Sequence, residues 1–579
     1  MAIINTSFYR ESDDALYSDG DIENIIYERV CKKDTTLSND PEWAVFYHFS
    51  PIRQNILNWY PFQEGCSILE VGAGCGALTG MLAQRAAHVT SCELTMKRAK
   101  ILYQRHKNYD NLEVCVGNFL EAEFDRKYDY IVVNGVLEYA RGIMGDLYDD
   151  PFAAFLKHAQ SYLKPDGTVL LAIENRLGLK YLAGAPEDHV GKTFAGVSGY
   201  KNGEHVQTFS KSELEALFER TGLSVHRWYY PYPDYKFPTE IFTDASVNSR
   251  KPVSQDIPFD MRRAALFDKD AVYETLMKDQ TAGNFSNSFL VELVTEEKIR
   301  EAEPTYVKIS NNRKKDFAVC TVLYEHNKFV EKIALYPEGR THLSKIAAHS
   351  DKDAPLKLVA YDTSCPQKLR YDLIEDESLR SILEQQIQAG EIESFWDTVR
   401  TLFNCLHTGA STLLQEDPQF ISVFGPEKTV KPLHWARNMN IDLNVDNVFR
   451  RDDHWLVIDN EWVFPFMIPA EYAMWRVLSQ LQLEKTFSDV LSTEAINRFL
   501  DITEEETRTF KQWEIFFAEQ YVGIQDLSPH YQPVIPLNVD AVLEQYQREN
   551  NLISHLFLFR ENSEPEILEC AAVNHDGVW

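Results

Sequence analysis

The stretch ILEVGAGCGALTGML, residues 68–82, decides the fold of the first half of the chain. A short apolar run ends at Val71, glycines follow at every second position from 72 to 76, and a second apolar run with helical spacing comes after them. Glycine adopts positive φ angles and lets the backbone approach a ligand closely. Free N–H groups at the start of a helix bind polar or anionic groups. The pattern therefore predicts a strand, a glycine-rich turn and a helix that together bind a ligand.

The same alternation of short apolar runs and helical patterns continues on both sides of this stretch. Helix candidates at 77–87 and 150–164 separate the strand candidates, which are 67–73, 88–94, 112–118, 128–135 and 168–175. This order is typical of a doubly wound, mostly parallel α/β sheet with a Rossmann-like topology. We expect that domain over residues 65–245. Residues 1–64 are expected to form a helical N-terminal lid, with an amphipathic helix over 43–60.

Beyond Pro252 the pattern changes to strands first and helices second. The runs 305–309, 317–325 and 328–336 predict an antiparallel meander, and helical patterns follow at 379–388 and 393–414. We expect a linker over 246–300 and a separate α+β domain over 301–483. Residues 484–579, with 6 basic and 18 acidic residues, are expected to be an acidic helical extension that mediates assembly and carries no chemistry.

Composition limits the class of protein. The chain has 579 residues, 44% of them apolar and 25% charged, with a net charge of −30. No run reaches the roughly 20 apolar residues that a bilayer span needs, and the N-terminal sequence lacks the features of a secretory signal. The nine cysteines are scattered, without CxxC spacing, which favours reduced thiols in a reducing compartment. We expect a cytoplasmic protein, and the acidity argues against a nucleic-acid partner.

An acidic residue supports the glycine-rich turn as a nucleotide site. Glu93 ends the second strand candidate, seventeen residues after Gly76, where a carboxylate can accept hydrogen bonds from both ribose hydroxyls. A dinucleotide-binding oxidoreductase uses the same arrangement, so an NAD-dependent enzyme is the direct alternative. Its G-x-G-x-x-G fingerprint is incomplete, because Ala77 stands at the last position.

The glutamate before the glycines favours another family. The set resembles the nucleotide-binding motif of class I S-adenosylmethionine-dependent methyltransferases. In that family the first acid and the glycines hold the methionine part of the cofactor, and the acid that ends the second strand holds the ribose. GNFLEAEF (117–124) resembles the adenine-contacting segment, and VVNGVLEY (132–139) resembles the strand end beside the sulfonium. The resemblance implies a cofactor site made of Glu70, Gly72, Gly74, Gly76, Glu93, Asn118, Phe119 and Asn134.

The sequence gives less information about the methyl acceptor than about the cofactor. Methyltransferases that act on exocyclic amines of DNA bases carry Asn/Asp-Pro-Pro-aromatic after the fourth strand, and this chain has Asn134-Gly135-Val136-Leu137. Acceptor-facing residues are expected in the loop 174–205 and in the aromatic-rich segment 228–242, which suits a sugar or simple loop packing. The candidates in the loop are Arg176, His189, Lys192 and His205, and none is assigned as the base of methyl transfer.

A second constellation lies in MNIDLNVDNVFRRDDHWLVIDNEW, residues 439–462. Asp442 precedes Asn447 by five positions, and Asp459 follows twelve residues later at a strand end. Phosphoryl transfer requires a carboxylate beside the attacking hydroxyl, plus an amide and a carboxylate on Mg²⁺. We therefore assign Asp442 as base and Asn447 and Asp459 as metal ligands. The same residues are also common in ordinary turns.

Residues 300–480 resemble the aminoglycoside-phosphotransferase-like kinases. The third meander strand, KFVEKIAL, matches the strand that carries the phosphate-binding lysine in kinases, which implies Lys332 as an ATP ligand. Asn440 and Ile441 replace the His or Arg that usually precedes the base, and the first hairpin turn, 310–317, has no glycine. The alternatives are an active kinase that uses ATP and Mg²⁺ and a pseudokinase that only scaffolds.

The combination of the two domains resembles the bifunctional methyltransferase–kinases that cap bacterial O-antigen polysaccharides. Those enzymes phosphorylate a terminal sugar and methylate the phosphate. The resemblance implies a glycan, glycolipid or sugar-phosphate acceptor, and a cytoplasmic protein or one associated peripherally with an envelope-glycan assembly complex at the inner membrane face. The alternative from another class is a non-catalytic glycan-assembly protein. The oligomeric state does not follow from the sequence.

Overall fold

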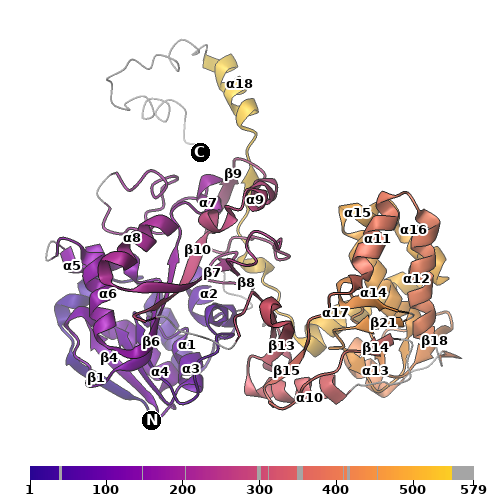
Figure 1. Cartoon of the computed structure of the whole chain (residues 1–579), viewed down its shortest axis with the longest axis horizontal. Helices are drawn as coiled ribbons and strands as arrows, with labels where there is room; N and C mark the ends of the chain where they lie inside the picture. The colour runs from indigo at the N-terminus through magenta and orange to yellow at the C-terminus, as the bar shows by residue number, and fades with distance from the viewer. Residues whose placement is uncertain are drawn as a thin grey trace.

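The structure is a computed structural model of the chain. It describes residues 1–37, 42–145, 148–201, 204–296, 302–310, 312–348, 356–407, 410–413, 417–452 and 454–550. Two lobes are visible in Figure 1: a sheet-centred first lobe built from the N-terminal half of the chain and a mainly helical second lobe. In the described part of the chain, every helix is too short or too polar to cross a membrane.

The first lobe is built on a parallel sheet whose strands follow the sequence pattern. The strands are β2 (Ser67–Val71), β3 (His88–Glu93), β4 (Leu112–Gly117), β5 (Tyr128–Asn134) and β6 (Leu163–Glu174). They lie in the order β4-β3-β2-β5-β6 and pair in parallel. The predicted Rossmann-like arrangement of this region is therefore confirmed.

Helices cover both faces of this sheet, so its strands are buried on both sides. The covering helices include α3 (Thr79–Arg85), α4 (Met96–His106), α6 (Pro151–Ser161) and α8 (Lys211–Thr221). Neighbouring residues enter opposite cores: Ile68 and Leu170 belong to one apolar cluster, Leu69 and Leu171 to the other. Burial on both faces explains why these strands are nearly continuous apolar runs in the sequence.

Residues 1–64 are not uniformly helical, which corrects the prediction. They begin with β1 (Ile3–Phe8), which pairs in parallel with β4 and forms the edge of the sheet. The helix α1 (Ile22–Lys32) follows. The single helix expected over 43–60 is instead α2 (Trp43–Phe49) and the 3₁₀ helix η2 (Pro51–Ile56). Proline lacks the N–H needed inside a helix, so Pro51 begins a new element.

The predicted linker over 246–300 is also corrected. It contains β9 (Arg263–Ala265), the helix α9 (Lys269–Lys278) and β10 (Ser288–Val294). β10 lies between β6 and β7 (Ser224–Tyr232) and is antiparallel to both. All seven residues of β10 are buried. The first domain therefore needs residues well beyond 245 to complete its sheet.

The second lobe is not separate from the first, contrary to the prediction. β8 (Glu240–Thr243) pairs with β7 on one side and with β11 (Tyr306–Ser310) on the other. The predicted meander then continues the same sheet with β12 (Val319–Tyr324), β13 (Phe329–Ala334) and β15 (Lys368–Asp372). One mixed sheet thus runs from the first lobe into the second.

The helical part of the second lobe has one core. Its helices include α11 (Leu379–Gln388), α12 (Ile392–His407), α14 (Ala470–Gln482), α16 (Thr493–Leu500) and α17 (Glu504–Phe516). Leu383 and Leu478 share an apolar cluster with Leu500 and Trp513. Residues 487–522 therefore belong to this lobe, which corrects the boundary predicted at 484.

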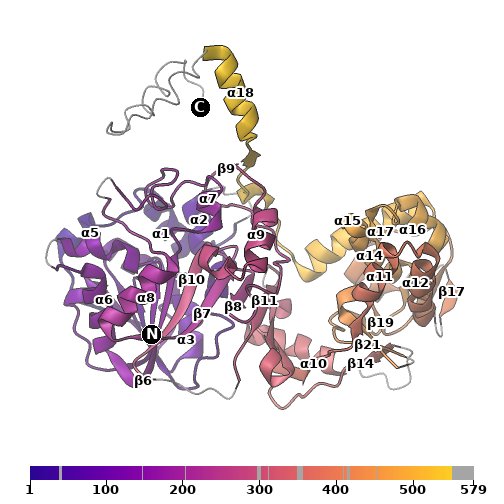
Figure 2. The same cartoon turned by 45° about the horizontal axis from the view of Figure 1, so that its top comes forward.

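The chain returns to the first lobe after α17. β24 (Val534–Pro536) pairs in parallel with β9, and the ring of His530 stacks on Phe46 of α2 at 4.6 Å between centroids. Figure 2 shows this segment running back from the second lobe before α18 (Val539–Asn550) projects away. The segment 528–537 is thus a second connection between the lobes.

If β10 completes the first sheet, Val291→Ala should destabilise the chain while Val253→Ala should not. Val291 is fully buried, whereas Val253 is 66% exposed. Loss of two buried methyl groups should lower the free energy of unfolding by roughly 1.5–3 kcal/mol, against less than about 0.5 kcal/mol at the exposed site. Chemical denaturation of both variants measures the difference, and equal stabilities would contradict the assignment of β10 to the core.

Candidate active site

The glycine-rich turn connects β2 to α3 and is shaped by backbone conformations that favour glycine. Gly72, Gly74 and Gly76 have φ angles of +69°, +57° and +79°. A Cβ atom on Gly72 would lie 2.4 Å from Cγ2 of Val136, and one on Gly74 would lie 3.1 Å from the guanidinium of Arg98. The turn therefore has no room for side chains, as the sequence predicts for a ligand-binding turn.

Glu93 fixes this turn to the end of β3. Its Oε2 accepts a hydrogen bond from the N–H of Gly74 at 2.8 Å, and its Oε1 accepts one from the N–H of Thr95 at 3.1 Å. Burial alone would lower the pKa of the neighbouring Arg98, but Glu93 and other acidic partners raise it well above its ordinary value. The predicted ribose-binding carboxylate is thus held in place beside the glycines.

Glu70 lies under the turn, where two hydroxyl groups hold its carboxylate. Its Oε2 accepts hydrogen bonds from Thr79 at 2.7 Å and from Ser91 at 2.6 Å. Burial raises the pKa of Glu70 to about 7, although the two hydroxyls act in the opposite direction. Glu70 therefore links β2, β3 and α3 around the glycines, so its role includes positioning the turn.

The predicted adenine-contacting residues line a narrow extension of the site. Asn118 and Phe119 border a cavity of about 50 Å³, together with Gly72, Leu94 and Val136. Asn118 caps the short helix η3 (Phe119–Glu121), because its Oδ1 accepts a hydrogen bond from the N–H of Leu120 at 3.1 Å. The apolar walls and the nearby amide suit a planar base.

A larger cavity of about 480 Å³ opens from the glycine-rich turn. Glu70, the glycine-rich turn, Glu93 and Asn134 form one wall, and the N-terminal residues Tyr17, Asp19, Trp43 and Tyr47 form another. A cavity of about 830 Å³ lies elsewhere, bordered by Tyr232, Tyr273 and Pro536, and includes none of the predicted cofactor residues. The chemistry therefore belongs to the 480 Å³ cavity.

The N-terminal segment lies across this cavity. The guanidinium of Arg98 lies 3.5 Å from Asp19 and stacks under the ring of Tyr17 at 4.7 Å. Tyr17 also makes an edge contact with Tyr139, at 5.6 Å between ring centroids. These contacts bring residues 17–19 over Glu93 and the glycine-rich turn.

The cavity residues are compatible with S-adenosylmethionine. Its adenine, ribose and methionine parts have matching surfaces in the apolar slot, the Glu93 carboxylate and the glycine-rich turn. Oδ1 of Asn134 is buried and has no hydrogen-bond partner among the described residues, so it can accept one from the cofactor. The fit thus rests on an unpartnered acceptor as well as on shape.

Comparisons with known proteins identify the family of this part of the chain. Residues 45–227 match the family described as "Methyltransferase domain". This part of the chain is a class I S-adenosylmethionine-dependent methyltransferase domain. The matched range contains every residue predicted to bind S-adenosylmethionine.

Several individual proteins are similar to the methyltransferase domain. A ribosomal RNA small subunit methyltransferase A from Syntrophus aciditrophicus is 27% identical over 127 residues, 22% of this chain and 43% of that protein. A ubiquinone biosynthesis O-methyltransferase from Chromobacterium violaceum is 26% identical over 147 residues, 25% of this chain and 59% of that protein. The chain thus spans about half the length of these two relatives.

A solved structure shows a weaker likeness. Phosphoethanolamine N-methyltransferase 1 of Haemonchus contortus, in complex with phosphoethanolamine and S-adenosylhomocysteine, is 14% identical with a TM-score of 0.28, covering 49% of this chain and 52% of that one. That score is too low to support any conclusion about this chain.

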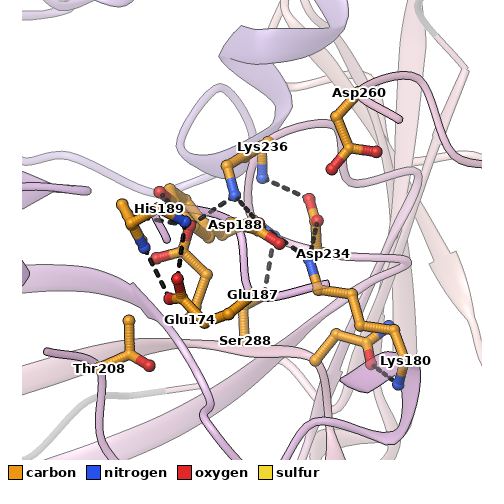
Figure 3. Close-up of polar contacts among 12 residues, drawn as sticks. Glu174, Lys180, Glu187, Asp188, His189, Thr208, Asp234, Lys236, Asp260 and Ser288 are labelled. Atoms are coloured by element: carbon orange, nitrogen blue, oxygen red, sulfur yellow. Dashed lines mark hydrogen bonds and ion pairs between the residues drawn. The ribbon is translucent and has the colours of Figure 1, made fainter. Parts of the chain in front are cut away.

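A buried charged cluster lies at the cavity wall, and Figure 3 shows Glu174, Asp188, His189 and Lys236 of this cluster. We call Glu138, Glu174, Glu187, Asp188, His189 and Lys236 the acceptor cluster. Nδ1 of His189 lies 2.9 Å from Glu187, and the ammonium of Lys236 lies 2.5 Å from both Glu174 and Asp188. All of these residues except Glu187 line the cavity.

The electrostatics of the cluster favour a protonated imidazole. Burial alone would lower the pKa of His189, but Glu174, Glu138 and Glu187 outweigh it and raise the pKa well above its ordinary value. Burial raises the pKa of Glu138, and the neighbouring Glu174 adds to the effect. The buried carboxylates of the cluster therefore favour a positively charged group among them.

Of the four loop residues suggested by the sequence, the structure brings His189 into the cavity. Arg176 forms a two-bond ion pair with Glu213, at 2.7 and 2.8 Å, away from the cavity lining. Lys192 and His205 are exposed. The sequence reasoning missed Glu138 and Glu174, although Glu174 ends the last parallel strand candidate, where ligands of such sheets bind.

The second lobe brings together three of the four predicted phosphotransfer residues. Nζ of Lys332 on β13 lies 2.7 Å from Asp459 and 3.7 Å from Glu461. Carboxylate oxygens of Asp442, Asp459 and Glu461 all lie within 4.8 Å of one another. Glu461, which also contacts His342 at 3.1 Å, was missed by the sequence reasoning.

Asn440 holds the loop that carries Asp442. Its Oδ1 accepts a hydrogen bond from the N–H of Asp442 at 2.9 Å, and its Nδ2 donates one to the carbonyl of Asp459 at 2.9 Å. The carbonyl of Asn447 accepts a hydrogen bond from the N–H of Ile458 at 3.0 Å, so Asn447 lies beside the strand leading to Asp459. Burial, then Asp459, raises the pKa of Asp442 to about 6.

Gly72→Ala should weaken cofactor binding, and Gly65→Ala is its matched control. Both glycines have similar positive φ angles, +69° and +75°, but a Cβ atom on Gly65 meets nothing within 4 Å. Both variants should lose about 1–2 kcal/mol of stability from backbone strain. Only Gly72→Ala should weaken binding of S-adenosylhomocysteine by tenfold or more, as measured by calorimetry. Equal affinities in the two variants would contradict the site.

Proposed function

We propose that the chain transfers the methyl group of S-adenosylmethionine to an oxygen of a glycan, glycolipid or sugar phosphate bound against the acceptor cluster. The observation that carries the proposal is that this polar cluster lines the same cavity as the glycine-rich turn. Oε2 atoms of Glu138 and Glu174 are buried without a hydrogen-bond partner among the described residues. A polyhydroxylated acceptor supplies the donors that these oxygens lack.

Cationic groups at the same wall support a phosphate-bearing acceptor. Lys236 and Arg53 both line the cavity. Arg53 is held by hydrogen bonds from Nη2 to the Tyr47 hydroxyl at 2.7 Å and from Nη1 to the carbonyl of Tyr235 at 3.1 Å. We propose that nucleic acid is not the acceptor, because the net charge is −30 and phosphate-tracking proteins need basic surface.

S-adenosylmethionine supplies an activated methyl group, and the protein's own residues place the acceptor oxygen in line with it. Glu138 and Glu174 are positioned to accept hydrogen bonds from acceptor hydroxyls, and Glu187 orients the imidazole of His189. A hydroxyl acceptor must lose its proton to a group at this wall as the new C–O bond forms. An ionised phosphate oxygen needs no base.

Tritiated S-adenosylmethionine should label the polysaccharide fraction of a cell-envelope extract in the presence of the full chain. His189→Ala should reduce this transfer by about 100-fold, with binding of S-adenosylhomocysteine unchanged. His205→Ala replaces an exposed histidine outside the cavity and should keep the wild-type rate. Label in RNA or protein, with none in polysaccharide, would refute the proposed acceptor class.

A second candidate function follows from the arrangement in the second lobe. We propose that it binds ATP with Mg²⁺ and phosphorylates the same glycan, with Asp442 as base. Asn447 and Asp459 would hold the metal and Lys332 the phosphates. The proposal is supported by the contact of Lys332 with Asp459 and by the cluster of Asp442, Asp459 and Glu461. A phosphate group added in this lobe would be the acceptor for methylation in the first lobe. The non-catalytic alternatives are a pseudokinase and an assembly scaffold.

Measurements of ATP binding and phosphate transfer distinguish a kinase from a pseudokinase and from a scaffold. Asp459→Ala should abolish Mg²⁺-dependent nucleotide binding, whereas Asp442→Ala should keep binding and lose phosphate transfer, since a base acts in the transition state. Absence of Mg²⁺-dependent nucleotide binding in the wild-type chain would overturn the kinase proposal.

A further inference from the structure

Three side chains of the acceptor cluster are arranged like the ligands of a cation. One oxygen of Glu138, one of Glu174 and one ring nitrogen of His189 all lie within 4.8 Å of one another. Glu138 and Glu174 are 1% and 0% exposed. The Oε2 atom of each is buried and lacks a hydrogen-bond partner in the described part of the chain. Buried carboxylate oxygens without partners are costly, so a positively charged ligand is expected here.

The distances fit a shared cation better than direct hydrogen bonds. Nε2 of His189 lies 3.7 Å from Oε1 of Glu138 and 3.9 Å from Oε1 of Glu174, which is too long for hydrogen bonds. Two ligands about 2.1 Å from one cation lie about 3.0 Å apart at a right angle and about 3.4 Å apart at a tetrahedral angle. If the distances between Nε2 of His189 and the two carboxylates shortened by roughly 0.5 Å, the three side chains could coordinate one cation.

Outer partners hold each of these side chains in the required orientation. Glu187 contacts Nδ1 of His189 at 2.9 Å, which leaves Nε2 directed at the two carboxylates. Oε1 of Glu174 accepts hydrogen bonds from Lys236 at 2.5 Å and from the hydroxyl of Tyr235 at 3.2 Å. A carboxylate behind a histidine and fixed carboxylates are the usual outer shell of a protein metal site.

The surrounding charges also leave room for a cation. Two aspartates lie beside the three proposed ligands: Asp188 pairs with Lys180 and Lys236, and Asp234 pairs with Lys180. The ammonium of Lys236 also pairs with Glu174 at 2.5 Å, whereas Glu138 pairs only with the imidazole of His189 in the described part of the chain.

We propose that Glu138, Glu174 and His189 bind a divalent cation such as Mn²⁺ or Mg²⁺. The cation would hold an acceptor that offers two neighbouring oxygens, either vicinal hydroxyls or a hydroxyl beside a phosphate. It would also lower the pKa of a bound hydroxyl, so that the acceptor oxygen is ready to attack. This inference rests on the proposed methyl transfer and specifies the chemistry of its acceptor.

Among the described residues of the second lobe, two other sets of side chains could bind the same ion and must be removed from the test. One is Asp442, Asp459 and Glu461; the other is His407, His434 and Glu471. Mn²⁺ binding is therefore measured on the full chain with Asp459→Asn and His434→Ala as background. Electron paramagnetic resonance counts the free ion during titration with Mn²⁺ alone, and calorimetry measures S-adenosylhomocysteine binding in the same samples.

The background chain should bind one Mn²⁺ at the cluster. Glu138→Gln and His189→Ala should each weaken Mn²⁺ binding by about 100-fold, the upper range for loss of a supporting group at a metal site, with S-adenosylhomocysteine affinity within twofold. Glu213→Gln is the matched control, since Glu213 pairs with Arg176 outside the cavity, and it should bind Mn²⁺ normally.

Three results would overturn the inference. If the background chain binds S-adenosylhomocysteine but no Mn²⁺, or if Glu138→Gln and His189→Ala bind Mn²⁺ as tightly as the control, the cluster is a metal-free acceptor site and the proposed methyl transfer stands. If the wild-type chain binds neither Mn²⁺ nor S-adenosylhomocysteine, the proposed function fails together with the cation site.

Discussion

The antiparallel insertion of β10 between β6 and β7 is the constraint on which the active site depends. The residues at the start of this strand hold both acceptor-side loops. Asn287 accepts a hydrogen bond from the N–H of Lys180 and donates one to the carbonyl of Pro233, and Ser288 accepts one from the N–H of Tyr235. Without β10 in the sheet, the loops that carry His189 and Lys236 would not face the glycine-rich turn.

The continuity of the sheet connects the two proposed chemistries. β8 is shared between the lobes, and the segment 528–537 returns to pack against α2, which also borders the cofactor cavity. A change in the second lobe can therefore reach the methyltransferase site through packed structure at two places. This physical connection suits successive reactions on one acceptor, a phosphorylation followed by a methylation.

The sequence predicted the features that follow from local pattern. The parallel strands were found because burial on both faces gives continuous apolar runs, and the glycine-rich turn with Glu93 was found because its spacing is local. β10 was missed, although SFLVELV is an apolar run, because nothing local indicates that a strand far along the chain inserts into an earlier sheet. A related reason explains why the sequence did not predict Glu138, Glu174 and Glu461: the residues that they contact are distant in sequence. Asn440 stands at the position where a histidine is expected. Its hydrogen bonds depend on side-chain geometry, which the spacing of residues in the sequence does not reveal.

Hydrogen–deuterium exchange with and without S-adenosylhomocysteine tests the central claim most directly, namely that the cavity of the glycine-rich turn binds the cofactor beneath the N-terminal segment. The structure predicts added protection in residues 17–23, 70–76, 93–98 and 117–120, which border the cavity or its adenine slot, and little change in the second lobe. Unchanged exchange in these segments, or equal protection by NAD, would contradict the assignment.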